Sequence, residues 1–126
     1  MTIARQRTGR LAEELVAERL RKSGWGIVER NARTRHGEID IVARDRSTLV
    51  FLEVKAARAG SGPCPQSPEL AVGPQKQRRL RRLAAAWLAE RRGRRSHFGE
   101  VRFDVVGVTF GPDDAVERYE HIRAAF

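Results

Sequence analysis

The 126-residue sequence predicts a single α/β domain in which a central mixed β-sheet is flanked by helices. The expected element order is α-β-β-β-α-β, followed by a further strand. Three observations point to this class. Two segments repeat apolar residues at the helical period, three strand patterns are joined by connections too short for crossovers, and a segment rich in β-branched residues follows the second helix. A chain of this length can bury a core without disulfides.

The first helix is predicted over residues 9–23, with Thr8 placed to cap its start and Ser23-Gly24 placed to end it. Glu13 lies at the edge of the apolar arc of this helix, and Arg19 interrupts the arc. The arc itself comprises Leu11, Ala12, Leu15, Val16 and Leu20.

Three strands then form an antiparallel meander. We place them at residues 25–30, 37–44 and 48–55, with a basic connection at 31–36 and a turn at 45–47. Residues 59–74 are rich in Gly and Pro, which predicts a long loop that is either functional or a mere insertion.

The second helix is predicted over residues 75–92, with Pro74 near its first turn and Gly93 as its stop. The strand that follows, residues 101–108, comes after a helical crossover, so we expect it to be central and parallel to the third strand. Residues 115–122 are predicted to form a fifth strand near an edge of the sheet.

The net charge of the chain indicates which kinds of partner it would bind. A formal net charge of +9 and a pI near 11.2 favour an anionic partner, with nucleic acid first and an anionic membrane surface second. No apolar run approaches the roughly 20 residues that span a bilayer, and the N-terminal segment lacks the apolar stretch of a signal peptide. Cys64 is the only cysteine, which suits a reducing compartment. We therefore expect a cytoplasmic protein.

Acidic residues on two neighbouring strands are the main functional signal. Strand alternation places Glu38 and Asp40 on one face of the second strand, together with Val42. On the third strand the same rule places Glu53 and Lys55 on one face. The meander can therefore bring Asp40 beside Glu53 and Lys55.

Two adjacent carboxylates repel each other, and a divalent cation removes that conflict. Hard oxygen ligands suit Mg²⁺ or Mn²⁺, and such a metal could support displacement at phosphorus. Glu13, on the preceding helix, could close the same site. The alternative is a surface ion pair between Glu53 and Lys55 or an arginine.

Other candidate residues have competing interpretations. His36 is either a solvated loop histidine or a ligand of phosphate or metal. We expect Asp104 to form a buried pair with an arginine, and Trp25 and Trp87 to lie in the core. The cluster Arg78, Arg79, Arg81 and Arg82 is either a solvated helix face or, as we favour, a track for a phosphate backbone.

These motifs resemble a known superfamily. Gly37-Glu38-Ile39-Asp40 followed by Glu53-Val54-Lys55 is similar to the signature of the PD-(D/E)XK phosphodiesterases, whose restriction-endonuclease-like core has the predicted element order. More narrowly, the chain resembles the YraN-like family of small bacterial proteins, akin in fold to archaeal Holliday-junction resolvases. The resemblance runs almost end to end and extends over Gly9, Ala12-Glu13, Gly24, Asn31, GEIDIVARD, LVFLEVKAAR, Ala71-Val72, Lys76, Arg102-Phe103-Asp104-Val105 and Ala125-Phe126. Two departures are the Pro-rich segment GSGPCPQSPEL, where the family usually has Phe-Gly, and Arg19, where an aromatic is common.

The resemblance implies a metal-dependent endonuclease or resolvase-like enzyme that acts on structured or branched nucleic acid. It favours DNA over RNA as the substrate. It implies Asp40, Glu53 and Glu13 as ligands of Mg²⁺ or Mn²⁺ and Lys55 as the catalytic lysine. Lys76 and Gln75 would point at the site, and Glu38 would support it or pair with Arg33 or Arg35. The resemblance also implies a homodimer. We expect the nucleic-acid-binding residues to be Lys76, Arg78, Arg79, Arg82, Arg33 and Arg35. The rival interpretation is a nucleic-acid-binding module that keeps the fold without catalysis.

Overall fold

A computed structural model describes residues 3–60, 72–91 and 99–126 of the protein. Most of the predicted 59–74 loop, with Cys64 in it, lies outside the described residues, as does the expected helix stop at Gly93.

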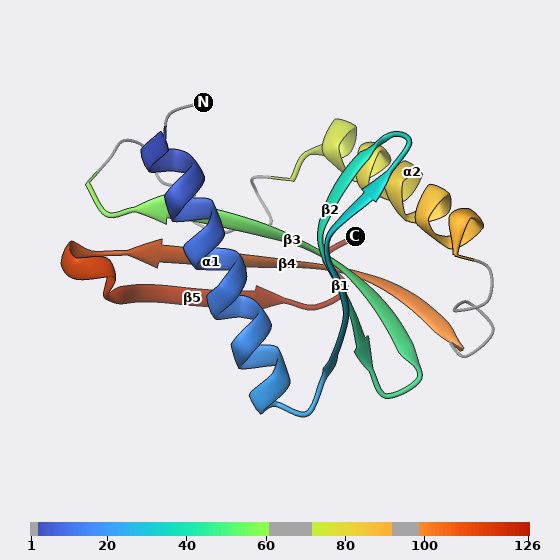
Figure 1. The fold of residues 1–126 in the computed structure, drawn as a ribbon, viewed down its shortest axis with the longest axis horizontal. Helices are drawn as coiled ribbons and strands as arrows, with labels where there is room; N and C mark the ends of the chain where they lie inside the picture. Colours follow the sequence, from blue (N-terminus) through green and yellow to red (C-terminus); the bar gives the residue numbers. More distant parts are fainter. Residues whose placement is uncertain (1–2, 61–71, 92–98) are drawn as a thin grey trace.

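Five strands form one mixed sheet in the order β1-β2-β3-β4-β5 (Figure 1). The first three are antiparallel to one another, β3 and β4 are parallel, and β4 and β5 are antiparallel. The predicted meander, the parallel fourth strand and the fifth strand at an edge are thus confirmed. The strands are β1 (Gly26–Thr34), β2 (Gly37–Asp45), β3 (Thr48–Arg58), β4 (Glu100–Phe110) and β5 (Val116–Ile122).

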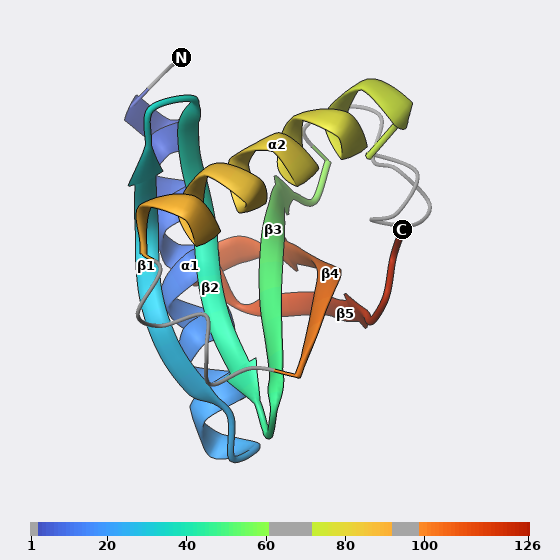
Figure 2. The ribbon, with the colours of Figure 1, turned by 90° about the vertical axis from the view of Figure 1, so that its right-hand side faces the viewer.

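The two helices, α1 (Ile3–Lys22) and α2 (Pro74–Glu90), cover opposite faces of the sheet (Figure 2). Each helix buries an apolar stripe against the strands. On the α1 face, Val16 and Leu20 pack with Ile41, Val50 and Val106. On the α2 face, the core cluster includes Leu80, Leu83, Trp87, Phe51 and Phe103. The element order is the predicted one, with a short 3₁₀ turn, η2 (Pro112–Asp114), between β4 and β5.

The start of α1 differs from the prediction. The helix begins at Ile3 rather than at residue 9, so Thr8 lies inside it and does not cap it. The Thr8 hydroxyl instead donates to the Ala4 carbonyl at 2.9 Å and accepts from Arg58 Nε at 3.0 Å. The first two turns carry no apolar stripe, so periodicity could not reveal them. Contacts with the distant ends of the sheet hold them in place, including an ion pair between Arg7 and Asp114 at 2.6 Å. The predicted end is confirmed by Gly24, whose φ is +92°.

Two strands are longer than predicted. β1 extends to Thr34, so the expected basic connection at 31–36 is wrong, and Arg35-His36 alone turn the chain into β2. β3 extends to Arg58, where it still pairs with β4. These added residues are mostly polar or basic, and pairing with the neighbouring strand makes them extended. The other predicted boundaries lie within two residues of the observed ones.

Candidate active site

The candidate site lies where β2 and β3 separate. The two strands pair from Asp45↔Thr48 to Ile41↔Leu52. Beyond that point, β2 continues paired with β1, and β3 continues paired with β4. Both views of the ribbon show β2 and β3 together at their connecting turn and apart at the other end (Figures 1 and 2). Asp40 and Glu53 are the first residues past the last pair, one on each strand.

A bend in the β1–β2 hairpin turns Asp40 into this separation. Asn31, next to Arg30 in β1, has a φ of +49°, a conformation that Asn tolerates better than most residues. Ile39, which pairs with Ala32 beside Asn31, packs on the α2 face although Ile41, two residues later, packs on the α1 face. The predicted alternation, with Ile39 and Ile41 on one side, is therefore wrong at this point. The Asp40 carboxylate accepts a hydrogen bond from the Val54 N–H at 2.9 Å, which replaces a strand-to-strand bond.

Alternation on β3 follows the prediction. Phe51 packs on the α2 face and Leu52 on the α1 face, so Glu53 and Lys55 continue the side that α2 covers. Lys55 Nζ lies 3.1 Å from Glu53 Oε1, with side chains only 24% and 19% exposed. The ion pair considered as the alternative therefore exists, but it lies within the candidate site rather than on the open surface.

The carboxylates of the site repel one another. Burial, and then the charge of Glu53, raise the pKa of Asp40 to about 7, although the hydrogen bond from Val54 opposes this. Burial alone would lower the pKa of Lys55. The hydrogen bond with Lys76 and the charge of Glu53 outweigh that effect and raise it. The ionised carboxylates of the site are thus destabilised by burial and by their mutual repulsion. A bound cation would relieve both effects.

Glu13 reaches the same site from α1. Burial raises its pKa, and the charges of Glu38 and Glu53 act in the same direction. Arg30, on β1, opposes the shift. Sequence reasoning missed Arg30, whose Nε is buried without a hydrogen-bond partner among the described residues. No local pattern marks Arg30, because its effect on Glu13 depends on a contact between residues distant in the sequence.

Lys76 places a second side-chain amino group beside Lys55. The hydrogen bond with Lys55, followed by burial, lowers the pKa of Lys76. Lys76 lies in the first turn of α2, so the predicted position at the site is supported by its contact with Lys55. Gln75, the neighbouring candidate, is exposed. The structure therefore brings together Glu13, Asp40, Glu53, Lys55 and Lys76 from four elements.

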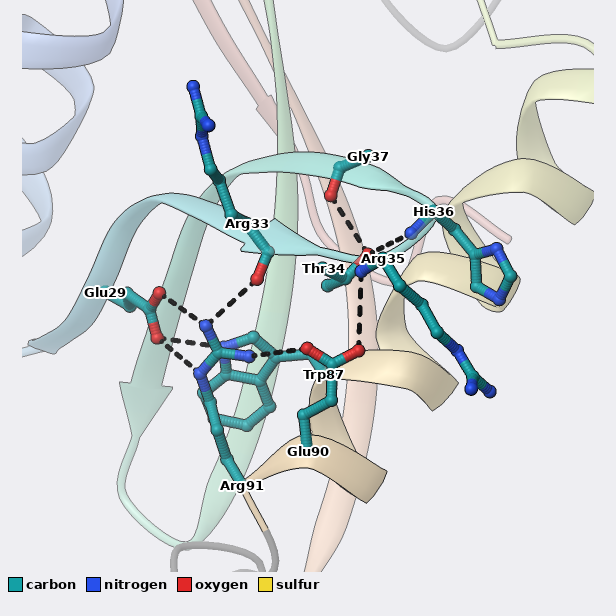
Figure 3. Close-up of polar contacts among 9 residues, drawn as sticks. All are labelled: Glu29, Arg33, Thr34, Arg35, His36, Gly37, Trp87, Glu90 and Arg91. Atoms are coloured by element: carbon teal, nitrogen blue, oxygen red, sulfur yellow. Dashed lines mark hydrogen bonds and ion pairs between the residues drawn. The ribbon is translucent and has the colours of Figure 1, made fainter.

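The tip of the β1–β2 hairpin is fixed to the end of α2 (Figure 3). Arg91, just after α2, forms an ion pair with Glu29 of β1 at 2.8 Å and donates to the Arg33 carbonyl at 3.1 Å. Glu29 also accepts from the Trp87 indole at 3.0 Å. The sequence did not reveal this clamp, since Glu29 and Arg91 are far apart in the chain and carry no motif. It holds the basic residues of the hairpin next to the end of α2.

The basic residues of the hairpin and α2 lie close together. A Cβ on Gly37, whose φ is +137°, would lie 3.3 Å from Arg79 Nη2, so the helix and the hairpin touch at this point. Arg33 pairs with Glu38 at 3.1 Å, as one interpretation of Glu38 predicted, yet its side chain stays 86% exposed. The exposed predicted nucleic-acid-binding residues are Arg33, Arg35, Lys76, Arg78, Arg79 and Arg82.

Other candidates lie away from the site. Arg81 stacks over Phe103 at 4.9 Å and over Phe126 at 5.3 Å, so it belongs to a packed aromatic group. His36 is exposed at the hairpin turn. The remaining core predictions are confirmed. Trp25 and Trp87 are buried, and Asp104 is buried in a pair with Arg102 at 2.8 Å.

Within residues 3–60, 72–91 and 99–126, no group of three or more His, Cys, Asp or Glu side chains is arranged to hold a metal by itself. Any cation at this site would therefore need additional oxygen ligands beyond Asp40 and Glu53, from water or from a phosphate. None of the described helices has a stretch long and apolar enough to cross a membrane.

Comparison with known proteins places the chain in a family. Residues 12–108 match the model of the uncharacterised protein family UPF0102. The chain belongs to this family. A UPF0102 protein of Streptomyces griseus is 50% identical over 120 residues, which cover 95% of this chain and 96% of that protein. A UPF0102 protein of Geobacter sulfurreducens is 48% identical over 115 residues, covering 90% and 84%. The YraN-like resemblance and the bacterial origin of such relatives are thereby confirmed, and the UPF0102 match spans every residue of the candidate site, from Glu13 to Lys76.

Proposed function

We propose that this UPF0102 protein is a metal-dependent phosphodiesterase that cleaves structured or branched DNA. The observation that carries the proposal is the convergence of Asp40 and Glu53 at the separation of β2 and β3, with Lys55 paired to Glu53. The similarity of these residues to the PD-(D/E)XK signature, and of the element order to the restriction-endonuclease-like core, supports the same activity.

The donor set fits a hard divalent cation. Asp40 and Glu53 would hold Mg²⁺ or Mn²⁺ through carboxylate oxygens, and Glu13 would contact the cation through a bound water. The bound cation would lower the pKa of a water molecule and stabilise charge on the phosphate. The same cation would relieve the repulsion that raises the pKa of Asp40.

The two lysines complete the proposed site. Lys55, held by Glu53, would orient the attacking water or contact the phosphate, and its raised pKa keeps it charged. Lys76 would contact a neighbouring phosphate oxygen from the first turn of α2. The two lysines would thus contact the phosphodiester from two elements, β3 and α2.

The exposed cations favour nucleic acid as the anionic substrate. The side chains of Arg33 and Arg35 extend from the clamped hairpin, and Arg79 lies beside Gly37 at the tip of the same hairpin. Such exposed arginines contact phosphates rather than bases, so we expect recognition of DNA shape more than of sequence.

The test combines metal binding and cleavage. Calorimetry with Mn²⁺ and assays on branched, flapped, single-stranded and duplex DNA compare the wild type with Asp40→Asn and Glu53→Gln. We expect both variants to lose Mn²⁺ binding and cleavage, whereas Lys55→Gln loses cleavage but keeps Mn²⁺ binding. Glu38→Gln is the matched control, since Glu38 is an exposed acid two residues from Asp40 and pairs with Arg33. Absence of Mn²⁺ binding in the wild type, with and without DNA, together with no cleavage of any substrate, contradicts the proposal.

A second candidate function is DNA binding without catalysis. The exposed arginines favour it, because they can hold a phosphate backbone with or without a metal. This function predicts DNA affinity that is unchanged by Asp40→Asn and by chelation, and no cleavage by the wild type. The cleavage assay therefore separates the two functions, whereas affinity alone does not.

A further inference from the structure

A second site lies on the α1 face of the sheet, between the C-terminal turn of α1 and the end of β5. It is a pocket with a volume of about 130 Å³. Of the described residues, those that line it are neutral or basic, and they include Arg19, Ser23, Trp25, Tyr119, His121 and Arg123. Arg19 is six residues beyond Glu13, which is about 9 Å along the helix. The pocket is therefore separate from the candidate active site.

Aromatic rings hold the two arginines of the pocket. The Arg19 guanidinium lies 4.1 Å from the centre of the Tyr119 ring, and that of Arg123 lies 5.4 Å from the centre of the Trp25 ring. Stacking restricts both side chains before any ligand binds, which lowers the entropic cost of binding. In the described part of the chain, no carboxylate forms an ion pair with either arginine, so their charges are available to an anion.

The acid that contacts His121 of the pocket is already paired with basic groups of the protein. His121 lines the pocket and makes a 2.8 Å hydrogen bond through Nε2 to Asp104. The Asp104 carboxylate is buried, forms an ion pair with Arg102 at 2.8 Å, and accepts from the Ala124 N–H at 3.0 Å. The Asp104 charge is therefore balanced by groups inside the protein. Its hydrogen bond with His121 fixes the orientation of the imidazole ring. Trp25 packs edge-on against that ring at 5.5 Å.

We propose that this pocket binds a phosphate group, carried either by a free mononucleotide or by the end of a nucleic acid strand. Two guanidinium groups and the hydroxyls of Ser23 and Tyr119 offer donors from different elements, which matches the several acceptor oxygens of a phosphate better than a single carboxylate. The volume equals that of roughly four water molecules, enough for a phosphate but too small for a whole nucleoside. The rest of the ligand would lie outside. This inference does not depend on the proposed nuclease activity.

The experiment uses the whole protein in EDTA, so that the proposed metal site plays no part. Inorganic phosphate is titrated at constant ionic strength while the two indole N–H signals are followed by NMR. Trp25 lies at the pocket and Trp87 lies on the opposite face, hydrogen-bonded to Glu29. We expect the Trp25 signal to shift with a Kd in the range of about 1 mM, and the Trp87 signal to stay.

The double variant Arg19→Gln/Arg123→Gln should weaken phosphate binding at least about tenfold. The control Arg10→Gln/Arg21→Gln removes the same charge from exposed positions of α1 outside the pocket, and should change binding less than about twofold. Equal weakening by both double variants, or no Trp25 shift at about 10 mM phosphate, overturns the proposal.

Two further titrations identify the source of the phosphate. An oligonucleotide with a 5′-phosphate is compared with the same oligonucleotide ending in a 5′-hydroxyl, and AMP is titrated separately. Stronger binding of the phosphorylated strand, lost in Arg19→Gln/Arg123→Gln, identifies a strand end. Equal binding of both strands, with AMP shifting the Trp25 signal, identifies a mononucleotide. Failure of AMP and of both strands to shift that signal overturns the proposal.

Discussion

Asp104 and Asp40 show how differently a sheet can accommodate a carboxylate. Burial alone would raise the pKa of Asp104, but hydrogen bonds from His121, Arg102 and the Ala124 N–H outweigh it and hold the pKa below its usual value. Asp40 has the Val54 N–H as its hydrogen-bond donor and a repelling Glu53 nearby, and its pKa rises to about 7. Asp104 therefore stabilises the fold when ionised, whereas Asp40 destabilises it. A destabilising acid is what a cation-binding site leaves in the protein when the cation is removed.

This contrast predicts opposite effects of the same substitution. In EDTA at pH 7.5, Asp104→Asn should lower the free energy of unfolding by about 3 kcal/mol, because Arg102 loses its buried partner. Asp40→Asn should raise it by about 1 kcal/mol, since the amide still accepts from Val54 and no longer repels Glu53. Urea unfolding measures both changes. A stabilising Asp104→Asn or a destabilising Asp40→Asn contradicts this account.

The pH dependence follows the directions of the two pKa shifts. The stabilisation by Asp104 is present above about pH 4 and is lost as pH falls through its lowered folded pKa, so the deficit of Asp104→Asn shrinks in strong acid. The raised pKa of Asp40 means that its cost is absent below about pH 4 and complete above about pH 7. The advantage of Asp40→Asn should therefore appear only as pH rises through that range.

At the scale of elements, the alternation of side chains along a strand does not predict the bend of the β1–β2 hairpin. Period-two reasoning was correct on β3, where Glu53 and Lys55 share a side. It was wrong on β2, where Ile39 packs on the α2 face opposite the stretch of β1 in which Asn31 has a positive φ. A single residue in the left-handed region leaves almost no trace in a hydrophobic pattern. Nevertheless, the bend creates the separation of β2 and β3 in which Asp40 meets Val54.

We therefore expect Asn31→Val to destabilise the protein by about 2 kcal/mol, because a β-branched residue is strained at positive φ. Asn31→Gly should stay within about 0.5 kcal/mol of the wild type, since glycine accepts that conformation. Thermal unfolding gives the stabilities, and Mn²⁺ calorimetry reports whether Asp40 keeps its position. A valine variant as stable as the wild type would show that the bend does not depend on the backbone at Asn31.

For the molecule as a whole, element order and strand direction could be predicted because they depend on coarse periodicity and connection length. The candidate acids and Lys55 could be predicted from spacing and resemblance. The first turns of α1, the clamp of Glu29 with Arg91 and the role of Arg30 could not. Each depends on contacts between residues distant in sequence, and none leaves a local pattern. Net charge, in turn, indicates an anionic partner but not the face that meets it.

The position of the charges predicts which face binds DNA. If the hairpin and α2 form the track, Arg35 and Arg79 each contact a phosphate, and each contact contributes about 0.9 to the slope of log affinity against log salt. Arg35→Gln/Arg79→Gln should therefore reduce the magnitude of that slope by about 2, measured by fluorescence anisotropy over a range of KCl concentrations. Arg10→Gln/Arg21→Gln removes equal charge from α1, on the opposite face, and should leave the slope unchanged. Equal reductions in both double variants would mean that DNA responds to the total charge of +9 and not to a defined face.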